Sequence, residues 1–533
     1  MDSNSNNDVS YGVPLVGLAA RGIPHLDCEA PDLYLGLSGG GFRATARHIG
    51  TILCLLRHDC LKSIRVITGV SGGAIATAWL AKWWADQRSL TTRPLGVEAL
   101  RSFLKPICAF MQRGIRRQIL LRWLLACACP YPYRRSPLEV VLDNELLQGF
   151  RMHECPLPTT FVIQTTDVGQ RAPLYLSNRG CSYSPLDLWR SIASPDAASL
   201  DNSLPMARAV AASAAFPALC SPVRIKARLR DPHTAAAVNG TLRCTDGGVM
   251  DNLGVEFLTE IVAVQRNSTL HIEDDSRDRL SKVMGLKAAL CFDAGRVVPL
   301  DKSAAERHGP RTGLGVIYNA GLSWLYDRVN TVASASFVGA CERHGIHAAL
   351  VDWRYLSPSP VDVASVRHNW PTDSMEYMLM NELTELIGDD GPSVSALSRH
   401  MQSMRTDFDS FSDTELFALI LSGYTGAMSA LRKAGYLGRF SEPDSQTEPW
   451  RSGCFECVHQ FTDGILSPIP ACDWITYLGL SKSRFKERAR IRAAARSRRS
   501  GLAQSMSPIE LISLRDENGK LKMHIDHIAD MKL

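Results

Sequence analysis

The most informative stretch of the chain is Ile64-Arg65-Val66-Ile67-Thr68-Gly69-Val70-Ser71-Gly72-Gly73. Its first residues predict a short buried strand, and the Ala-rich run that ends near Trp84 predicts a helix after it. The turn between them, Gly69-Val70-Ser71-Gly72-Gly73, fits G-x-S-x-G, in which a sharp bend lifts a nucleophilic serine out of the sheet. Glycine at the flanking positions avoids a clash, and the helix start points N–H groups at developing negative charge. We therefore expect Ser71 to be a nucleophile and the N–H of Gly72 to help hold an oxyanion, with a plain tight turn as the alternative.

An earlier glycine turn, Ser38-Gly39-Gly40-Gly41, follows a predicted strand over 33–37 and precedes a helix expected from Arg43 to Arg57. Three successive glycines expose backbone N–H groups and tolerate close approach of a ligand. The turn lacks the P-loop sequence, and Ala44 stands where a dinucleotide-binding loop needs its last glycine. An oxyanion loop that faces Ser71 is the better interpretation.

A third turn, Asp246-Gly247-Gly248, also follows a predicted strand. A carboxylate at such a position can reach a neighbouring strand end and accept the proton of a serine. Asp-Gly turns are common for structural reasons, so this turn alone leaves both roles open.

The remaining pattern predicts an α/β fold. Strand signals lie at 161–166, 174–176 and 286–292, and helical signals lie near 205–215, from about 255, and at 414–431. Short apolar strands separated by helices form βαβ units, which indicate a mainly parallel central sheet covered by helices.

Together with Ala211-Ala212-Ser213-Ala214-Ala215-Phe216-Pro217, the three turns, in this order, resemble the patatin-like phospholipases of the bacterial type. The resemblance covers residues 30–300, and more weakly the helices to about 435. It implies a three-layer α/β/α hydrolase core with a Ser–Asp dyad, no catalytic histidine, no metal or organic cofactor and no calcium dependence. The family often has Asp where Ser38 stands and Gly where Ala44 stands, and both departures lie at the rim of the glycine loop.

Carried over residue by residue, the resemblance makes Ser71 the nucleophile and Asp246 the general base. The amides of Gly39, Gly40 and Gly41 would form the oxyanion hole together with that of Gly72. The supporting residues would be Arg43, Gly69, Gly73, Gly247 and Gly248.

The chain has 533 residues, of which 45% are hydrophobic and 21% charged, with a formal net charge of +5. This composition excludes wholesale disorder. We expect a polar leader at 1–30, a catalytic domain at 31–300, a helical extension at 301–437 packed on it, and a linker with a basic tail at 438–533. No window reaches the ~18–20 uninterrupted apolar residues of a membrane-spanning helix.

A basic, apolar insertion at 90–155 interrupts the catalytic domain. Residues 101–135 contain eight Lys or Arg and no Asp or Glu. On a helix near 110–125, Arg113, Arg116 and Arg117 share one face and apolar residues such as Trp123 follow, which is typical of a helix lying on anionic lipid. We expect a lid or lipid-entry element that contacts membrane phospholipids, with a buried helix that has a solvated edge as the alternative.

Two further features lie outside this core. Residues 482–499 carry nine Lys or Arg and one Glu, which suits nucleic acid, anionic lipid, an acidic partner or a solvated helix, and we expect no specific nucleic-acid binding. Cys454, Cys457 and His459 are a weak metal pattern, and buried thiols are the alternative. The polar, acidic first eight residues lack a secretory signal, so we expect a cytoplasmic protein with peripheral membrane association. The oligomeric state stays open.

Two other interpretations of the whole chain stay open. One is an α/β-hydrolase with a Ser–Asp–His triad, whose histidine would come from His271, His308, His344, His347 or His368. The other is a non-catalytic membrane-binding protein that retains the fold.

Overall fold

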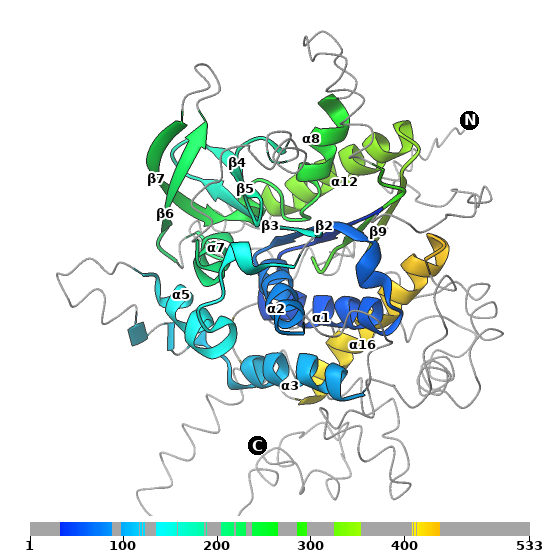
Figure 1. Cartoon of the computed structure of the whole chain (residues 1–533), viewed down its shortest axis with the longest axis horizontal. Coiled ribbons are helices and arrows are strands. Elements are labelled where there is room, and N and C mark those ends of the chain that lie inside the picture. The colour runs from blue at the N-terminus through cyan, green and yellow to red at the C-terminus, as the bar shows by residue number, and fades with distance from the viewer. Residues whose placement is uncertain are drawn as a thin grey trace, which may run out of the picture.

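A mixed nine-stranded sheet runs through the centre of the computed structural model (Figure 1). The structure describes residues 32–87, 97–122, 135–188, 204–230, 237–264, 285–295, 325–352 and 408–436, apart from 117, 120, 157, 186–187, 218–219, 409 and 412. Among these residues, helices cover both faces of the sheet, so the three-layer α/β/α class predicted from the sequence is confirmed.

Five strands run parallel in the order β9-β8-β1-β2-β3. Their bounds are β1 Leu33–Leu37, β2 Ile64–Val70, β3 Thr160–Asp167, β8 Ala288–Phe292 and β9 His347–Val351. Strands β1, β3 and β8 are buried along their whole length because helices lie on both sides of them. The carboxyl ends of all five strands therefore meet at one edge of the sheet, which we call the carboxyl edge.

Four antiparallel strands complete the sheet beyond β3: β4 Ala172–Ser177, β5 Gly180–Ser182, β6 Val223–Arg230 and β7 Ala237–Asp246. Strand β3 pairs with β4 along one side. The other side of β3 pairs with two strands in succession. It pairs with β2 as far as Gln164, which lies opposite Val70, and from Thr165 on it pairs with β7, whose last residue Asp246 lies opposite Thr165. Because β2 and β7 run in opposite directions, they end head to head. The turns that follow these two strands are thereby brought together.

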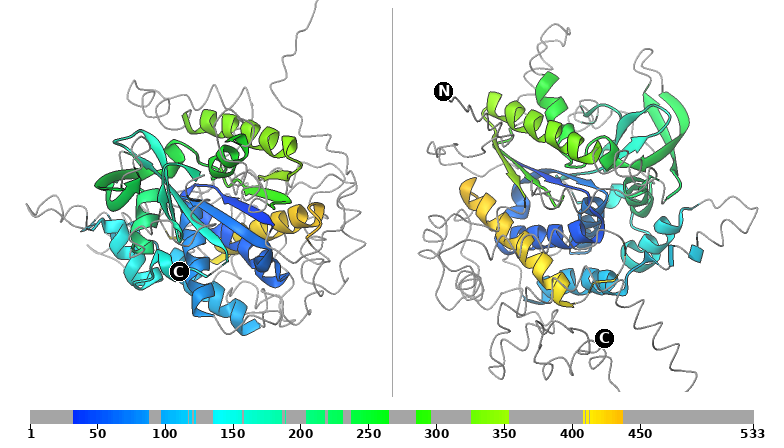
Figure 2. Two further views of the ribbon diagram at one scale, coloured as in Figure 1. Left: turned by 45° about the horizontal axis from the view of Figure 1, so that its top comes forward. Right: turned by 180° about the vertical axis from the view of Figure 1, so that it is seen from behind.

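The helices form two layers (Figure 2). On one face, α1, α2, α7 and α16 share an apolar core with α3 and α5, and on the other face α8 and α12 enclose a smaller core. The bounds are α1 Gly41–Arg57, α2 Gly72–Asp86, α3 Val97–Arg113, α5 Pro137–Leu142, α7 Met206–Ser213, α8 Glu256–Val264, α12 Leu325–Arg343 and α16 Asp413–Lys433. Short turns of helix are η1 Cys60–Ser63, η2 Asp143–Leu147, η3 Met152–Glu154 and η4 Gly247–Val249.

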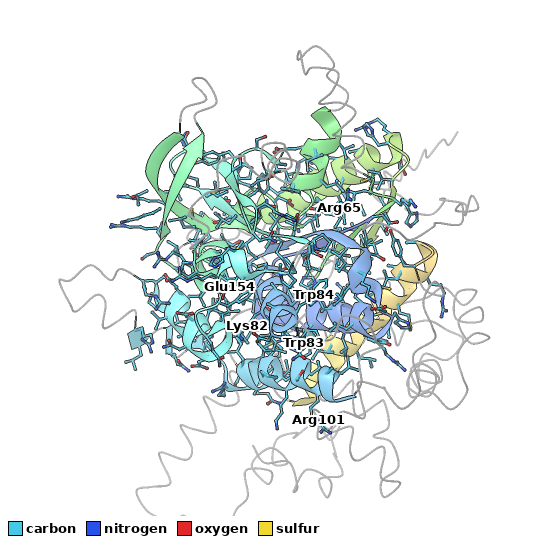
Figure 3. All side chains as sticks on the ribbon, in the orientation of Figure 1. Arg65, Lys82, Trp83, Trp84, Arg101 and Glu154 are labelled. Carbon is cyan, nitrogen blue, oxygen red and sulfur yellow. The ribbon has the colours of Figure 1, made fainter. Side chains whose placement is uncertain are left out.

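Helix α2 packs with aromatic side chains in two directions (Figure 3). Trp83 lies edge-on to Phe103 of α3 and donates from Nε1 to the Ser102 hydroxyl at 2.9 Å. Trp84 lies edge-on to Phe161 of β3. The insertion is therefore attached to the central sheet through α2.

The helices and strands expected from the sequence are correct for the βαβ units, but some strands elsewhere in the sheet were not expected. The extension expected to be helical at 301–437 also supplies β9, which pairs with β8 in the central sheet. A strand before Asp246 was predicted, but β6 and its pairing with β7 in a hairpin were not.

Candidate active site

Ser71 occupies a strained turn directly after β2. Its φ of 48° and ψ of −109° lie in a region that non-glycine residues rarely adopt, at a cost of about 1–3 kcal/mol. A Cβ on Gly73 would collide with the backbone of Leu37 and Ser38, and one on Gly72 would collide with the backbone of Gly41. The glycines of the motif are therefore required by the close approach of the two glycine turns.

A buried serine of α7 holds this turn. The amide of Ser71 donates to the hydroxyl of Ser213 at 2.9 Å, and that hydroxyl donates to the carbonyl of Gln164 at 2.5 Å. The Ser213 side chain is fully buried. It therefore links the turn that carries Ser71 to β3, next to the point where β2 and β7 end head to head.

Asp246 ends β7 and meets Ser71, as the sequence interpretation requires. Its side chain is 3% exposed and accepts from the amide of Gly248 at 2.7 Å, and it lies near enough to the Ser71 side chain for that hydroxyl to affect its pKa. Burial raises the pKa of the Asp246 carboxyl to about 7, and the Gly248 amide and the Ser71 hydroxyl limit the rise. A Cβ on Gly247 would collide with the carbonyl of Gln164, so glycine is needed next to the carboxylate.

The glycine loop lies between β1 and α1, and the first turns of α1 and α2 touch. Thr45 of α1 donates to the carbonyl of Gly72 at 2.9 Å. Within the described part of the chain, the amides of Gly40, Gly41 and Gly72 donate to no protein acceptor, as is usual at helix starts. These three amides are available for a ligand.

The expectation for Gly39 needs correction. Its amide donates to the carbonyl of Asn252 at 2.8 Å, so it is occupied and does not serve as an oxyanion donor in this structure. A Cβ on Gly39 would collide with the side chain of Asn252 and contact that of Ser71. Gly39 thus makes room beside the nucleophile, and its N–H anchors the loop to the turn after η4.

The turn after β8 supports the glycine loop from behind. The hydroxyl of Ser38 accepts from the amide of Ala294 at 2.7 Å, and Arg43 donates from Nη2 to the carbonyl of Ala294 at 3.0 Å. His48 donates from Nε2 to the carbonyl of Ser38 at 2.9 Å, and burial lowers the pKa of this imidazole to about 3, which keeps it neutral. Arg43 and Ser38 thus both hold the glycine loop to the turn after β8.

Sequence reasoning missed several of these supports. Ser213 lies inside the quoted Ala-rich motif, where it was assigned no role, and Asn252 lies four residues after the third glycine turn. His48 and Ala294 carried no recognisable signal. Only the three-dimensional contacts show what these residues do.

The histidines expected for a triad do not reach the described site. His344 and His347 lie just before and at the start of β9, at the sheet edge opposite Ser71. His271, His308 and His368 lie outside the described residues.

The insertion is only partly described. Arg113 and Arg116 are exposed, and the side chain of Arg113 lies 3.7 Å from Glu145. The helix breaks at Gly114, whose φ is 63°, and Ile115 behind it is buried. The side chain of Leu121 is 60% exposed, and Arg117 and Trp123 lie outside the described residues.

Other expectations also fall outside the described residues: the leader at 1–30, the linker and tail at 438–533 with the basic run 482–499, and Cys454, Cys457 and His459. Among the described residues, no cluster of three or more potential metal ligands occurs. None of the described helices combines the length and apolar character that a membrane-spanning segment needs.

Comparison with known proteins gives one family. Residues 35–259 match the family model of the patatin-like phospholipases. No curated protein sequence matches the chain. Among solved structures, the human GIVD cytosolic phospholipase A2 bound to methyl γ-linolenyl fluorophosphonate is similar at 12% identity, with 76% of this chain and 59% of that chain covered and a TM-score of 0.32. VipD from Legionella pneumophila is similar at 11% identity, with 83% and 91% covered and a TM-score of 0.20. The chain thus spans about three-fifths of the length of the human protein.

Proposed function

Residues 35–259 are a patatin-like phospholipase domain, and from this premise we propose that the protein is a serine acyl hydrolase that cleaves ester bonds of membrane lipids. One observation carries the proposal. Ser71 stands in a strained strand-to-helix turn at the end of β2, beside the buried carboxyl of Asp246 at the end of β7, whose pKa is raised to about 7. A carboxylate with a pKa near neutrality is a far better proton acceptor than an ordinary one.

The reaction follows in two steps. Ionised Asp246 removes the proton of the Ser71 hydroxyl while Oγ attacks the ester carbonyl carbon, which gives a tetrahedral intermediate. Collapse of this intermediate expels the alcohol, which takes the proton from Asp246, and leaves an acyl-Ser71 ester. Water, deprotonated by Asp246, then attacks that ester and releases the fatty acid, and the proton returns to Ser71.

The developing oxyanion is held by backbone amides. Gly40 and Gly41 at the start of α1, and Gly72 at the start of α2, present N–H groups at two touching helix starts. Preorganised donors of this kind stabilise charge that forms only in the transition state. The Ser38–Ala294 and Arg43–Ala294 hydrogen bonds keep the loop that carries these donors in place.

The proposed lipid substrate finds support in the insertion. Phe42, next to the oxyanion loop, lies edge-on to Phe110 of α3 and to Phe408. The helix that ends at the exposed Arg113 is thus linked to the start of α1 through aromatic packing, and Arg116 and Leu121 are exposed in the segment that follows it. Basic and apolar side chains exposed together suit an anionic lipid surface.

Covalent labelling tests the nucleophile. A fluorophosphonate probe should label the wild-type protein and fail to label the Ser71→Ala variant, while Ser177→Ala, which removes a buried serine far from the site, should label normally. Lipid mass spectrometry of mixed vesicles treated with each protein would then identify the released acids. Absence of labelling in folded protein on vesicles would favour a non-catalytic lipid-binding protein.

Charge reversal tests the insertion separately. Replacing Arg113, Arg116 and Arg117 by Glu should reduce hydrolysis of anionic vesicles and spare a soluble short-chain ester. Equal loss on both substrates would rule out a lipid-contact role and indicate that the insertion is needed for folding.

A further inference from the structure

The β6–β7 hairpin has a basic outer face that the proposed chemistry does not use. Along β6, Val223 and Ile225 are buried, whereas Arg224 and Lys226 are exposed. The register places Arg224 directly opposite Arg243 of β7, which is also exposed. We call Arg224, Lys226 and Arg243 the hairpin patch; Arg228 and Arg230 occupy the next register positions of the same alternation.

The hairpin extends past the carboxyl edge of the sheet. Only Cys244 to Asp246 of β7 pair with β3, and Val168 then donates to the carbonyl of Arg243 at 2.8 Å. Residues 237–243 pair with β6 alone, so the hairpin continues for about 20 Å beyond β3. Figure 1 shows β6 and β7 projecting at one side of the sheet. The hairpin patch therefore starts within a few residues of the catalytic carboxylate, on the edge where Ser71 lies.

Within the described residues around the hairpin, no exposed carboxylate balances the positive charge of the patch. Among the described residues of the hairpin and the β3–β4 turn, the carboxylates are Asp167 and Asp246, and both are buried. No ion pair of Arg224, Lys226 or Arg243 occurs within the described part of the chain. Like charges directly opposite each other on paired strands destabilise a hairpin. An anionic partner would remove this repulsion.

We propose that the hairpin patch docks the protein on an anionic lipid surface beside the active site. The proposal rests on the proposed function, because a lipid hydrolase needs its carboxyl edge at a bilayer. The outer face of the hairpin carries regularly spaced basic side chains, which suit phosphate headgroups. Val168, next to the start of the hairpin, is 47% exposed, and an exposed apolar side chain there suits the acyl chains of the same lipids.

Vesicle flotation with the full chain tests the proposal. The Arg224→Glu, Lys226→Glu, Arg243→Glu variant is compared with the parent, both carrying Ser71→Ala so that the lipid stays intact. The expected loss of affinity is about fivefold per basic residue, thus on the order of 100-fold, for phosphatidylcholine vesicles containing phosphatidylserine. Vesicles of phosphatidylcholine alone should show little difference.

A matched control uses three exposed basic residues at the opposite edge of the sheet. Lys62, Arg343 and Lys433 lie at or just after the ends of α1, α12 and α16, and their replacement by Glu changes the net charge equally. This variant should lose far less affinity. The proposal would be overturned if both variants lost vesicle affinity equally, or if the hairpin variant lost none. The basic side chains of the hairpin would then serve only to protect a sheet edge from pairing with another chain.

RNA binding and ester hydrolysis are two further measurements that distinguish a lipid partner from a nucleic acid, and a failure of docking from a failure of catalysis. Loss of binding to an RNA oligonucleotide with unchanged vesicle binding would also overturn the proposal, since the partner would then be a nucleic acid. Hydrolysis of a soluble short-chain ester, measured with Ser71 intact, should be unchanged by the hairpin substitutions. If the wild-type protein hydrolyses no ester, the proposed function fails, while vesicle binding still decides the docking proposal on its own.

Discussion

Asp246 has to be both buried and ionised to act as a base. Burial raises the pKa of its carboxyl from 3.8 to about 7, so below this pH most molecules carry the protonated, inactive form. We expect kcat/KM for a soluble ester to fall about tenfold per pH unit below pH 7 and to level off above it. A pH–rate profile checks this. A profile that stays flat between pH 5 and 7 would contradict the role of Asp246 as the base.

The same carboxylate lowers the stability of the fold. A carboxyl whose folded-state pKa is raised stabilises the folded state fully only below its unfolded pKa of 3.8, and this stability is lost as the pH rises to about 7. Ionised Asp246 therefore costs up to about 4 kcal/mol above pH 7. The Asp246→Asn variant should unfold at higher urea concentration than wild type at pH 8, with the difference shrinking towards pH 4. A variant that is less stable than wild type at pH 8 would show that the carboxylate's hydrogen bonds outweigh its burial.

Ser213 holds the turn that carries Ser71, the proposed nucleophile. The Ser213→Ala variant loses the acceptor of the Ser71 amide and the donor to Gln164. The strained turn should then relax, and we expect kcat to fall about 10–100-fold with KM nearly unchanged, because small misplacements of a nucleophile are costly. Steady-state kinetics below the unfolding temperature measure this. Ser177→Ala is the control, since Ser177 is buried in the β4–β5 turn and donates to Gly180 away from the site. Equal kcat values for the two variants would show that Ser213 has only a structural role.

At the scale of elements, α1 and α16 pack through glycine. A Cβ on Gly423 would collide with the carbonyl of Arg47, and one on Gly50 would collide with the carbonyl of Ile420. Backbone atoms cannot move aside as side chains do, so we expect Gly423→Ala to lower the free energy of unfolding by about 2–4 kcal/mol. Urea denaturation measures the change. In the control Gly339→Ala, the new methyl on α12 meets only the end of the Arg343 side chain, and the effect should be neutral or slightly stabilising. A neutral Gly423→Ala would mean that the two helices do not pack this closely.

Helices and strands could be predicted from the sequence where the local residue pattern alone determines the structure that the fold requires. The two glycine turns lie between strands and helices because no other residue fits there, and the sequence shows this directly. The β6 strand, Val-Arg-Ile-Lys-Ala-Arg-Leu-Arg, alternates regularly and could have been recognised as a half-buried strand. β9 could not, since its residues His347–Val351 are weakly apolar and become a strand by pairing with β8. The occupied amide of Gly39 depends on Asn252, a contact between distant parts of the chain that no local pattern encodes.

At the scale of the whole molecule, residues beyond 300 help to hold the glycine loop that carries the proposed oxyanion donors. Arg47 is fully buried on α1 and donates to the carbonyls of Asp293 and Asp352, at the ends of β8 and β9. The turn that begins at Asp293 holds the glycine loop through Ala294. β9 and the glycine loop are therefore parts of one hydrogen-bonded assembly, although the family model ends at residue 259.

Truncated chains test whether the elements beyond residue 300 are needed for the fold and for the site around Ser71. A chain that ends at residue 300 loses α12, β9 and α16, which uncovers one side of α1 and leaves β8 as a bare edge strand. We expect it to aggregate or to lack cooperative thermal unfolding, and to take up no fluorophosphonate probe. A chain that ends at residue 437 keeps these elements and should unfold cooperatively and be labelled at Ser71. The reason is that burial of Arg47 is tolerable only while the carbonyls at the end of β9 accept its hydrogen bonds. Cooperative unfolding and labelling of the shorter chain would show instead that the catalytic domain is complete by residue 300.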